Sequence, residues 1–133
     1  MGEITSDAAT MAALGRQMTR AVQKQAVAAG NLANVDTPGY RTKEAEFGEA
    51  LDSALEPAGL AATHARHFGV TAGGPGAADV RERDGLAARR DGNNVQMDRE
   101  LLAIGRAAGE FTSAQTALAA KFRLVRYAIN EGR

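Results

Sequence analysis

The sequence has 133 residues, enough for one domain, and its 44% hydrophobic fraction includes only 5% aromatic residues and no tryptophan. Sixteen basic residues balance sixteen acidic ones, so the charge does not favour nucleic acid or an anionic membrane as a partner. The absence of cysteine excludes disulfides and thiolate metal sites, and the many alanines favour closely packed helices over a thick apolar core.

A long first helix is expected from about Ala8 to Ala33. Its apolar positions recur at steps of three and four, which is the heptad pattern of a helix that packs along one face. Charged residues interrupt the segment, so it lacks the continuous apolar stretch of a cleaved signal peptide. The seam of this helix is formed by Met11, Leu14, Met18, Gln25 and Leu32.

The segment from Asn31 to Tyr40 predicts a sharp corner at the end of this helix. Asn34 follows the last apolar helical position and suits the left-handed cap of a helix. Pro38 holds the preceding residue in an extended conformation, and Gly39 can supply the positive φ that a type II turn requires. A turn is therefore expected from Thr37 to Tyr40.

The middle segment, residues 41–96, is expected to be rich in loops. Spacing of its apolar residues allows a short amphipathic helix from Glu44 to Leu55, and the low complexity of Gly69 to Ala78 predicts flexibility. The pair Asp91-Gly92 predicts a small β-hairpin between Leu86–Arg90 and Asn94–Met97.

A second long helix is expected from Met97 through the end of the sequence. Acidic residues at its start suit the positive end of the helix dipole. Its apolar positions step by four and three without interruption. The seam is formed by Leu101, Ile104, Phe111, Gln115, Leu118, Phe122, Val125 and Ile129.

These elements predict a mainly α fold in which residues 1–40 and 97–133 form one helical domain, an antiparallel pair resembling a coiled coil. Small residues flank both seams where a two-stranded coiled coil normally carries charges, so the apolar stripes are wide enough to contact further chains. Gln25 and Gln115 either face each other across the pair or lie at the edge of the stripe in contact with water.

No catalytic pattern is present in the sequence. His64 and His67 are the only histidines, and they have no convincing third metal ligand nearby. Phosphate-binding loops, nucleophile elbows and dinucleotide-binding glycine patterns are absent as well. We therefore expect no enzymatic activity, cofactor or small-molecule substrate.

Two motifs carry a resemblance to a known family. The segment Asn31-Leu-Ala33-Asn34-Val-Asp-Thr37-Pro38-Gly39-Tyr40 resembles the Asn-x-Ala-Asn-x-x-Thr-Pro-Gly-Tyr signature that follows the N-terminal helix of bacterial axial flagellar proteins. The segment Asp91-Gly92-Asn93-Asn94-Val95 is similar to the one that introduces the C-terminal helix in one branch of the flagellar basal-body rod proteins.

The resemblance implies a structural subunit whose terminal helices pack with those of its neighbours into the axial tube of the rod, which transmits torque and conducts exported subunits. It implies as partners other copies of the chain, the rod subunits FlgC and FliE, the membrane-ring protein FliF at the rod base, and the export apparatus in transit. It also implies a periplasmic location reached by type III export without a cleaved signal peptide. The alternatives are a soluble two-helix adaptor and another rod subunit such as FlgC.

Overall fold

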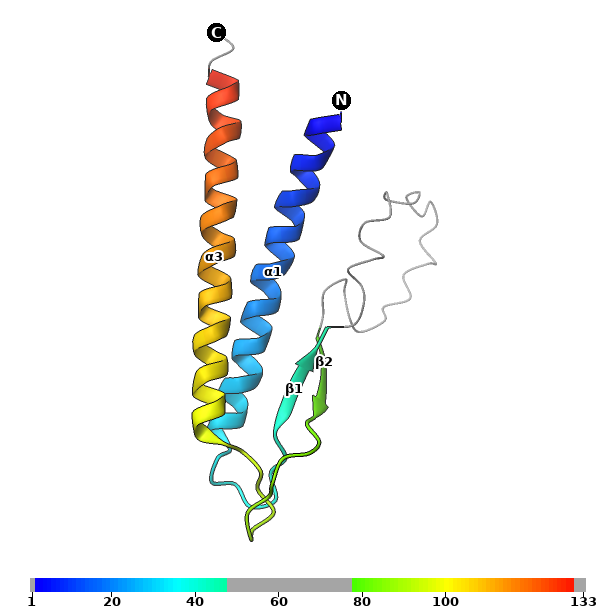
Figure 1. The fold of residues 1–133 in the computed structure, drawn as a ribbon, viewed down its shortest axis with the longest axis vertical. Helices are drawn as coiled ribbons and strands as arrows, with labels where there is room; N and C mark the ends of the chain where they lie inside the picture. Colours follow the sequence, from blue (N-terminus) through cyan, green and yellow to red (C-terminus); the bar gives the residue numbers. More distant parts are fainter. Residues whose placement is uncertain (1, 48–77, 131–133) are drawn as a thin grey trace, which may run out of the picture.

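The structure, a computed structural model, describes residues 2–47 and 78–130, with side chains described from residue 7 onward. Its elements in chain order are α1 (Gly2–Ala33), β1 (Lys43–Glu46), β2 (Asp79–Glu82) and α3 (Met97–Asn130) (Figure 1). The fold is mainly α, with two long helices packed together, as the sequence predicts. Helix α1 ends at Ala33 as expected, but it begins earlier than the predicted Ala8.

The two helices run antiparallel, and they diverge from the corner towards the two chain ends (Figure 1). Polar contacts connect them along their length. Near the corner Asn31 Nδ2 donates to Glu100 Oε2 at 3.0 Å, and further along Lys24 pairs with Glu110 at 2.8 Å. Towards the ends, Lys121 reaches Asp7 at 2.6 Å. These contacts fix the register of α1 against α3, because residues progressively earlier in α1 contact residues progressively later in α3.

Alanines form the buried contact face of the pair. Ala21 and Ala28 on α1 and Ala107 and Ala114 on α3 are buried, each pair spaced by one heptad. Such small side chains let two helices approach closely. On α3 the buried positions 107 and 114 lie next to the predicted seam, and the seam residues Phe111 and Leu118 remain half-buried beside α1.

The predicted seam residues are only partly covered within the chain. Half-buried positions are Met11, Leu14, Met18, Leu32, Ile104, Phe111, Leu118 and Val125. Several others remain open to solvent: Leu101 is 51% exposed, Phe122 56% and Ile129 69%. Gln25 and Gln115 are also exposed, and no hydrogen bond joins them in the described part of the chain. Both glutamines therefore meet water in the single chain.

A small two-stranded antiparallel sheet lies beside the lower half of the helix pair (Figure 1). Lys43 is paired with Glu82 and Glu46 with Asp79, and the strand surface is almost entirely exposed. Its side chains are mostly charged. Arg81 pairs with Asp79 at 2.7 Å, and the hydrogen bond and charge of this carboxylate raise the pKa of the Arg81 guanidinium.

The predicted position of the hairpin is wrong. The turn at Asp91-Gly92 forms, with Gly92 at φ 84, but its flanks at 86–90 and 94–97 are not strands. The reason is that backbone groups near this turn bind the corner instead, since Gly39 N–H donates to the Asp91 carbonyl at 2.9 Å. The short helix predicted from Glu44 is also wrong at its start, where residues 44–46 belong to β1.

Other expectations fall on residues that the structure does not describe. These are the remainder of the short helix (residues 48–55), the low-complexity segment up to residue 77, and both histidines, His64 and His67. Neither α1 nor α3 contains, within its described residues, a stretch apolar and long enough to span a bilayer.

Candidate functional site

The two motifs that stand out in the sequence lie against each other in the structure. Gly39 N–H donates to the Asp91 carbonyl at 2.9 Å, and Asn94 N–H donates to the Tyr40 carbonyl at 3.3 Å. Residues 31–40 leave α1 and residues 91–95 lead into α3. The contact between the motifs therefore joins the end of one helix to the start of the other.

The corner itself has the turn that the sequence predicts. Tyr40 N–H donates to the Thr37 carbonyl at 3.2 Å, and Gly39 has φ 73, as the second central position of a type II turn requires. Asn34 caps α1 through its side chain, since its Nδ2 donates to the Gly30 carbonyl at 2.8 Å. Thr37 Oγ1 in turn donates to Asn34 Oδ1 at 3.2 Å.

The buried side chain of Asn93 binds the backbone of the corner. This side chain is fully buried, and its Nδ2 lies 2.9 Å from the carbonyl oxygen of Asn34, 3.1 Å from that of Val35 and 2.8 Å from that of Thr37. Its Oδ1 accepts from Val95 N–H at 2.7 Å. Three carbonyl groups of the corner that follows α1 are thereby bound by a residue far away in sequence.

Asn31 connects the last turn of α1 to both β1 and α3. Its Oδ1 accepts from Lys43 N–H at 2.9 Å and its Nδ2 donates to the Lys43 carbonyl at 2.8 Å. Nδ2 also donates to Glu100 Oε2 at 3.0 Å, and Tyr40 Oη lies 3.3 Å from Asn31 Oδ1. Asn31 is 1% exposed, so this single amide fixes three segments at a buried point.

Asn94 completes the set of buried amides. Its Oδ1 accepts from Thr42 N–H at 2.6 Å. Within the described residues, Asn94 Nδ2 and Thr42 Oγ1 are buried without a protein partner.

Two glycines make the close approach of the motifs possible. Gly39 and Gly92 both have positive φ, at 73 and 84. A Cβ on Gly92 would lie 3.4 Å from the Gly39 Cα, so the two backbones pass at van der Waals distance. A side chain at either position would be strained by φ alone.

The other motif residues lie around this centre. Val95 is buried at 3% exposure, and its carbonyl accepts from Arg89 Nη2 at 3.0 Å. Ala33, Pro38 and Asp91 are exposed. The predicted motif residues are thus brought together in one region, whereas the predicted seam residues extend along the two helices away from it.

Two residues of this region were missed as site residues from sequence. Glu100 suits the helix dipole at the start of α3, but it is also 5% exposed and accepts a hydrogen bond from Asn31. Thr42 lies in a segment expected to be a loop, yet it is 2% exposed. In the sequence, Glu100 lies seven residues before Ala107 and fourteen before Ala114, and these three residues are buried on the face of α3 that contacts α1. This heptad spacing could have indicated that Glu100 is buried.

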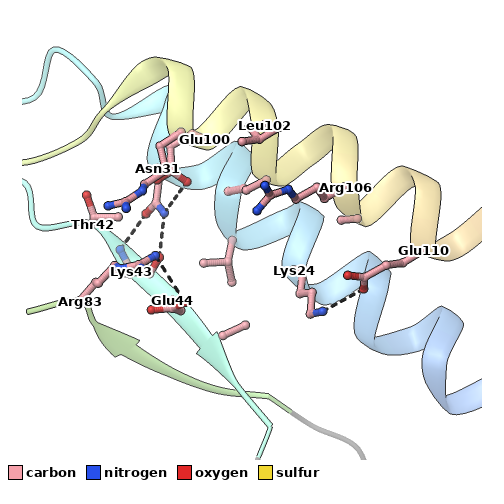
Figure 2. A pocket seen from close by; sticks show the side chains of 16 residues that line it. Lys24, Asn31, Thr42, Lys43, Glu44, Arg83, Glu100, Leu102, Arg106 and Glu110 are labelled. Carbon is pink, nitrogen blue, oxygen red and sulfur yellow. Dashed lines mark hydrogen bonds and ion pairs between the residues drawn. The ribbon is translucent and has the colours of Figure 1, made fainter.

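A groove of about 570 Å³ lies beside this region, between α1, α3 and β1 (Figure 2). Charged side chains from all three elements line it, and Lys24 and Glu110 close one end (Figure 2). Among the described residues no group of three or more His, Asp or Glu side chains is arranged to hold a metal ion.

The buried amides beside the groove bind backbone groups in and just after the corner. Such an arrangement fixes the path of the chain between α1 and α3.

Comparison with known proteins agrees with this arrangement. The sequence model of the family described as "Flagella basal body rod protein" matches residues 12–41, which include the last part of α1 and the corner. The chain is 34% identical over 85 residues to the flagellar basal body rod protein FlgB of Escherichia coli. It is 41% identical over 68 residues to FlgB of Cereibacter sphaeroides, and 29% identical over 120 residues to FlgB of Bacillus subtilis.

The matched lengths differ among these relatives. The Escherichia coli match covers 59% of this chain and 62% of the relative, so the chain spans less than two thirds of that protein. The Cereibacter sphaeroides match covers 50% of this chain and 52% of the relative. The Bacillus subtilis match is more extensive, at 82% of this chain and 92% of the relative.

These matches show that the chain is similar to the flagellar basal body rod proteins. Within that class, the particular protein that it resembles is FlgB, the name carried by each of the relatives described above.

Proposed function

We propose that this chain is a structural subunit of the proximal part of the flagellar basal-body rod, and that it assembles through α1 and α3 into the axial tube. The tube would transmit torque and conduct exported subunits. The similarity to FlgB proteins supports the proposal, and the exposed apolar surface of the helix pair is the structural observation that carries it.

The exposed large apolar side chains of α3 lie in two groups, one at each end of the helix. They are half exposed or more in the single chain: Met97, Leu101, Leu102, Phe122, Leu124, Tyr127 and Ile129. Groups of exposed large apolar side chains mark sites of protein association. Head-to-tail contacts between such sites generate open helical arrays, which suits a tube.

The corner would set the direction in which the chain leaves the tube. Buried amides of Asn31, Asn93 and Asn94 tie residues 31–43 to residues 91–100 near the junction of α1 and α3. Because these bonds reach the backbone, they specify the path of the chain more strictly than apolar packing does. The two motifs thus supply a fixed connection, and the helices supply the contacts between subunits.

The partners in this proposal are other copies of the chain, the rod subunits FlgC and FliE, and the membrane-ring protein FliF at the base. The chain would reach the periplasm through the flagellar type III export apparatus without a cleaved signal peptide. Catalysis has no part in this function, which is mechanical.

Fractionation tests the proposal directly. Basal bodies purified from cells that express the tagged chain should contain it in stoichiometric amount with the other rod subunits. The competing function, a cytosolic two-helix adaptor, predicts a stable complex in the cytosolic fraction and no chain in the basal bodies. The second result would overturn the proposal.

A further inference from the structure

The groove between α1, α3 and β1 carries more positive than negative charge. It is lined by five cationic side chains, Lys24, Lys43, Arg83, Arg99 and Arg106, and by three carboxylates, Glu44, Glu100 and Glu110. The chain as a whole is formally neutral. The excess is therefore a local property of this surface.

The carboxylates in the groove already have partners. Glu110 pairs with Lys24 at 2.8 Å, and Glu44 pairs with Arg83 at 3.4 Å. Glu100 is buried and accepts from Asn31 at 3.0 Å. None of the three is thus left free to neutralise a further cation.

Arg99 and Arg106 are two exposed cations of the groove that have no carboxylate partner in the described ranges. The fifth cation, Lys43, lies over the ring of Tyr40, with Nζ 5.8 Å from the ring centroid. Two guanidinium groups on the same wall of the groove are consequently available to an external anion.

Between these two arginines lies an exposed apolar side chain. Leu102 is 53% exposed, and steps of three and four residues place Arg99, Leu102 and Arg106 on one face of α3. A ligand that satisfies this face must offer two anionic groups with an apolar group between them. A peptide segment with two carboxylates flanking an apolar residue has this chemistry.

We propose that this groove docks an acidic segment of a neighbouring rod subunit, whose carboxylates pair with Arg99 and Arg106 while its apolar side chain covers Leu102. The inference rests on the proposed function for the identity of the partner. A phosphate polyanion fits the groove less well, because it offers no apolar group to cover the exposed side chain of Leu102.

Charge reversal gives the first test. In cells that depend on the variant, Arg99→Glu combined with Arg106→Glu should lower the number of completed rods by about tenfold or more, since like charges would then face each other. The matched control is Arg90→Glu, an exposed arginine in the turn before the second motif, which should assemble normally. Circular dichroism of the purified variants checks that α1 and α3 are retained. Normal rod numbers in the folded double variant would overturn the inference.

Photo-crosslinking identifies the partner segment. A benzoylphenylalanine placed at Leu102 in the full chain should, in purified basal bodies, crosslink to a peptide in which Asp or Glu flanks an apolar residue. Changing those carboxylates to lysine should restore rods in the Arg99→Glu, Arg106→Glu background. A crosslinked peptide without carboxylates, or no crosslink at all, would overturn the inference while the chain's presence in the basal bodies still supports the proposed function. Absence of the chain from basal bodies would instead reject the proposed function itself.

Discussion

The side chain of Asn31 pairs with the backbone of Lys43 as a neighbouring strand would. Oδ1 accepts from Lys43 N–H at 2.9 Å, and Nδ2 donates to the Lys43 carbonyl at 2.8 Å. The free edge of β1 is therefore satisfied at its first residue by a helix side chain. The same Nδ2 donates to Glu100, so the position of β1 is coupled to the start of α3.

Asn31→Asp should destabilise the fold in a pH-dependent way. It replaces a buried donor by an oxygen facing Glu100 and the Lys43 carbonyl, which should cost about 2 kcal/mol or more at neutral pH. Protonation of one of the two facing carboxylates restores a donor. The folded variant then binds this shared proton more tightly than the unfolded chain, so stability is gained at low pH and lost as the pH rises.

Urea unfolding of Asn31→Asp at several pH values, followed by circular dichroism, measures this effect. The control is Glu100→Gln, which keeps an oxygen acceptor for Asn31 and removes the charge. The variant Asn31→Asp should regain part of its lost stability relative to wild type on acidification, whereas Glu100→Gln should not. A pH-independent deficit in Asn31→Asp would show that the Asn31 and Glu100 side chains do not face each other.

Asn93→Asp should disrupt the corner more than any exposed change nearby. The substitution removes the amide that donates to three carbonyl oxygens and places a carboxylate among them, so a loss of about 2–4 kcal/mol is expected. Asp91→Asn is the comparison, since it keeps the oxygen that accepts from Asn93 N–H at 3.0 Å. Equal stabilities for the two variants in urea would contradict the assigned role of Asn93.

Gly39→Val should strain the turn. The residue has φ 73, and a β-branched side chain in this region costs about 1–2 kcal/mol. Gly30→Ala serves as the control, because Gly30 is helical and its added Cβ would meet nothing within 4 Å. That variant should be neutral or slightly more stable, by up to about 1 kcal/mol. Thermal unfolding of both proteins distinguishes the two sites, and an unstrained Gly39→Val would exclude the turn described here.

Ala107→Leu should push the helices apart. Ala107 is 1% exposed at the close contact with α1, so the larger side chain should cost about 1–3 kcal/mol by overpacking. Its neighbour Ala108 is exposed, and Ala108→Leu should change stability little. If Ala108 faced α1 in place of Ala107, the order of the two effects would be reversed. Urea titration of the two variants decides between these faces.

Local chemistry explains why the helices and the corner could be predicted from sequence. Repeats of three and four residues define a long helix whatever it packs against, and a Pro-Gly pair limits the turn types available to the backbone. The end of α1 at Ala33 and the positive φ of Gly39 follow from such short-range constraints.

The packing face and the sheet could not be predicted in the same way. Alanine and larger apolar residues both contribute to the apolar face of a helix. The sequence pattern alone therefore does not say whether Ala107 or Ala108 faces α1. β1 and β2 have almost no apolar alternation, so their pairing depends on Asn31 and on the rest of the fold.

The contact between the two motifs could not be predicted from the sequence either. Contacts such as Asn93 to the Thr37 carbonyl span 56 positions, and an asparagine donates to any carbonyl that the fold places within reach. Sequence identifies each motif as unusual, but the geometry that brings the amide of one onto the backbone of the other arises only in the folded chain.

Phe122→Asp tests whether subunits assemble through the exposed apolar residues of α3. Phe122 is 56% exposed, so the change should leave the single chain folded while placing a charge in the contact between subunits. Leu118→Asp is less decisive, because Leu118 is half-buried beside α1. Phe122→Leu keeps the apolar surface and is the control.

The deciding measurement is the number of basal bodies with complete rods, counted by electron microscopy in cells that depend on each variant. Cells that carry Phe122→Asp should have normal levels of exported protein but no complete rods, and cells that carry Phe122→Leu should have near-normal rods. Complete rods and full motility in cells carrying Phe122→Asp would contradict assembly through the exposed apolar residues of α3.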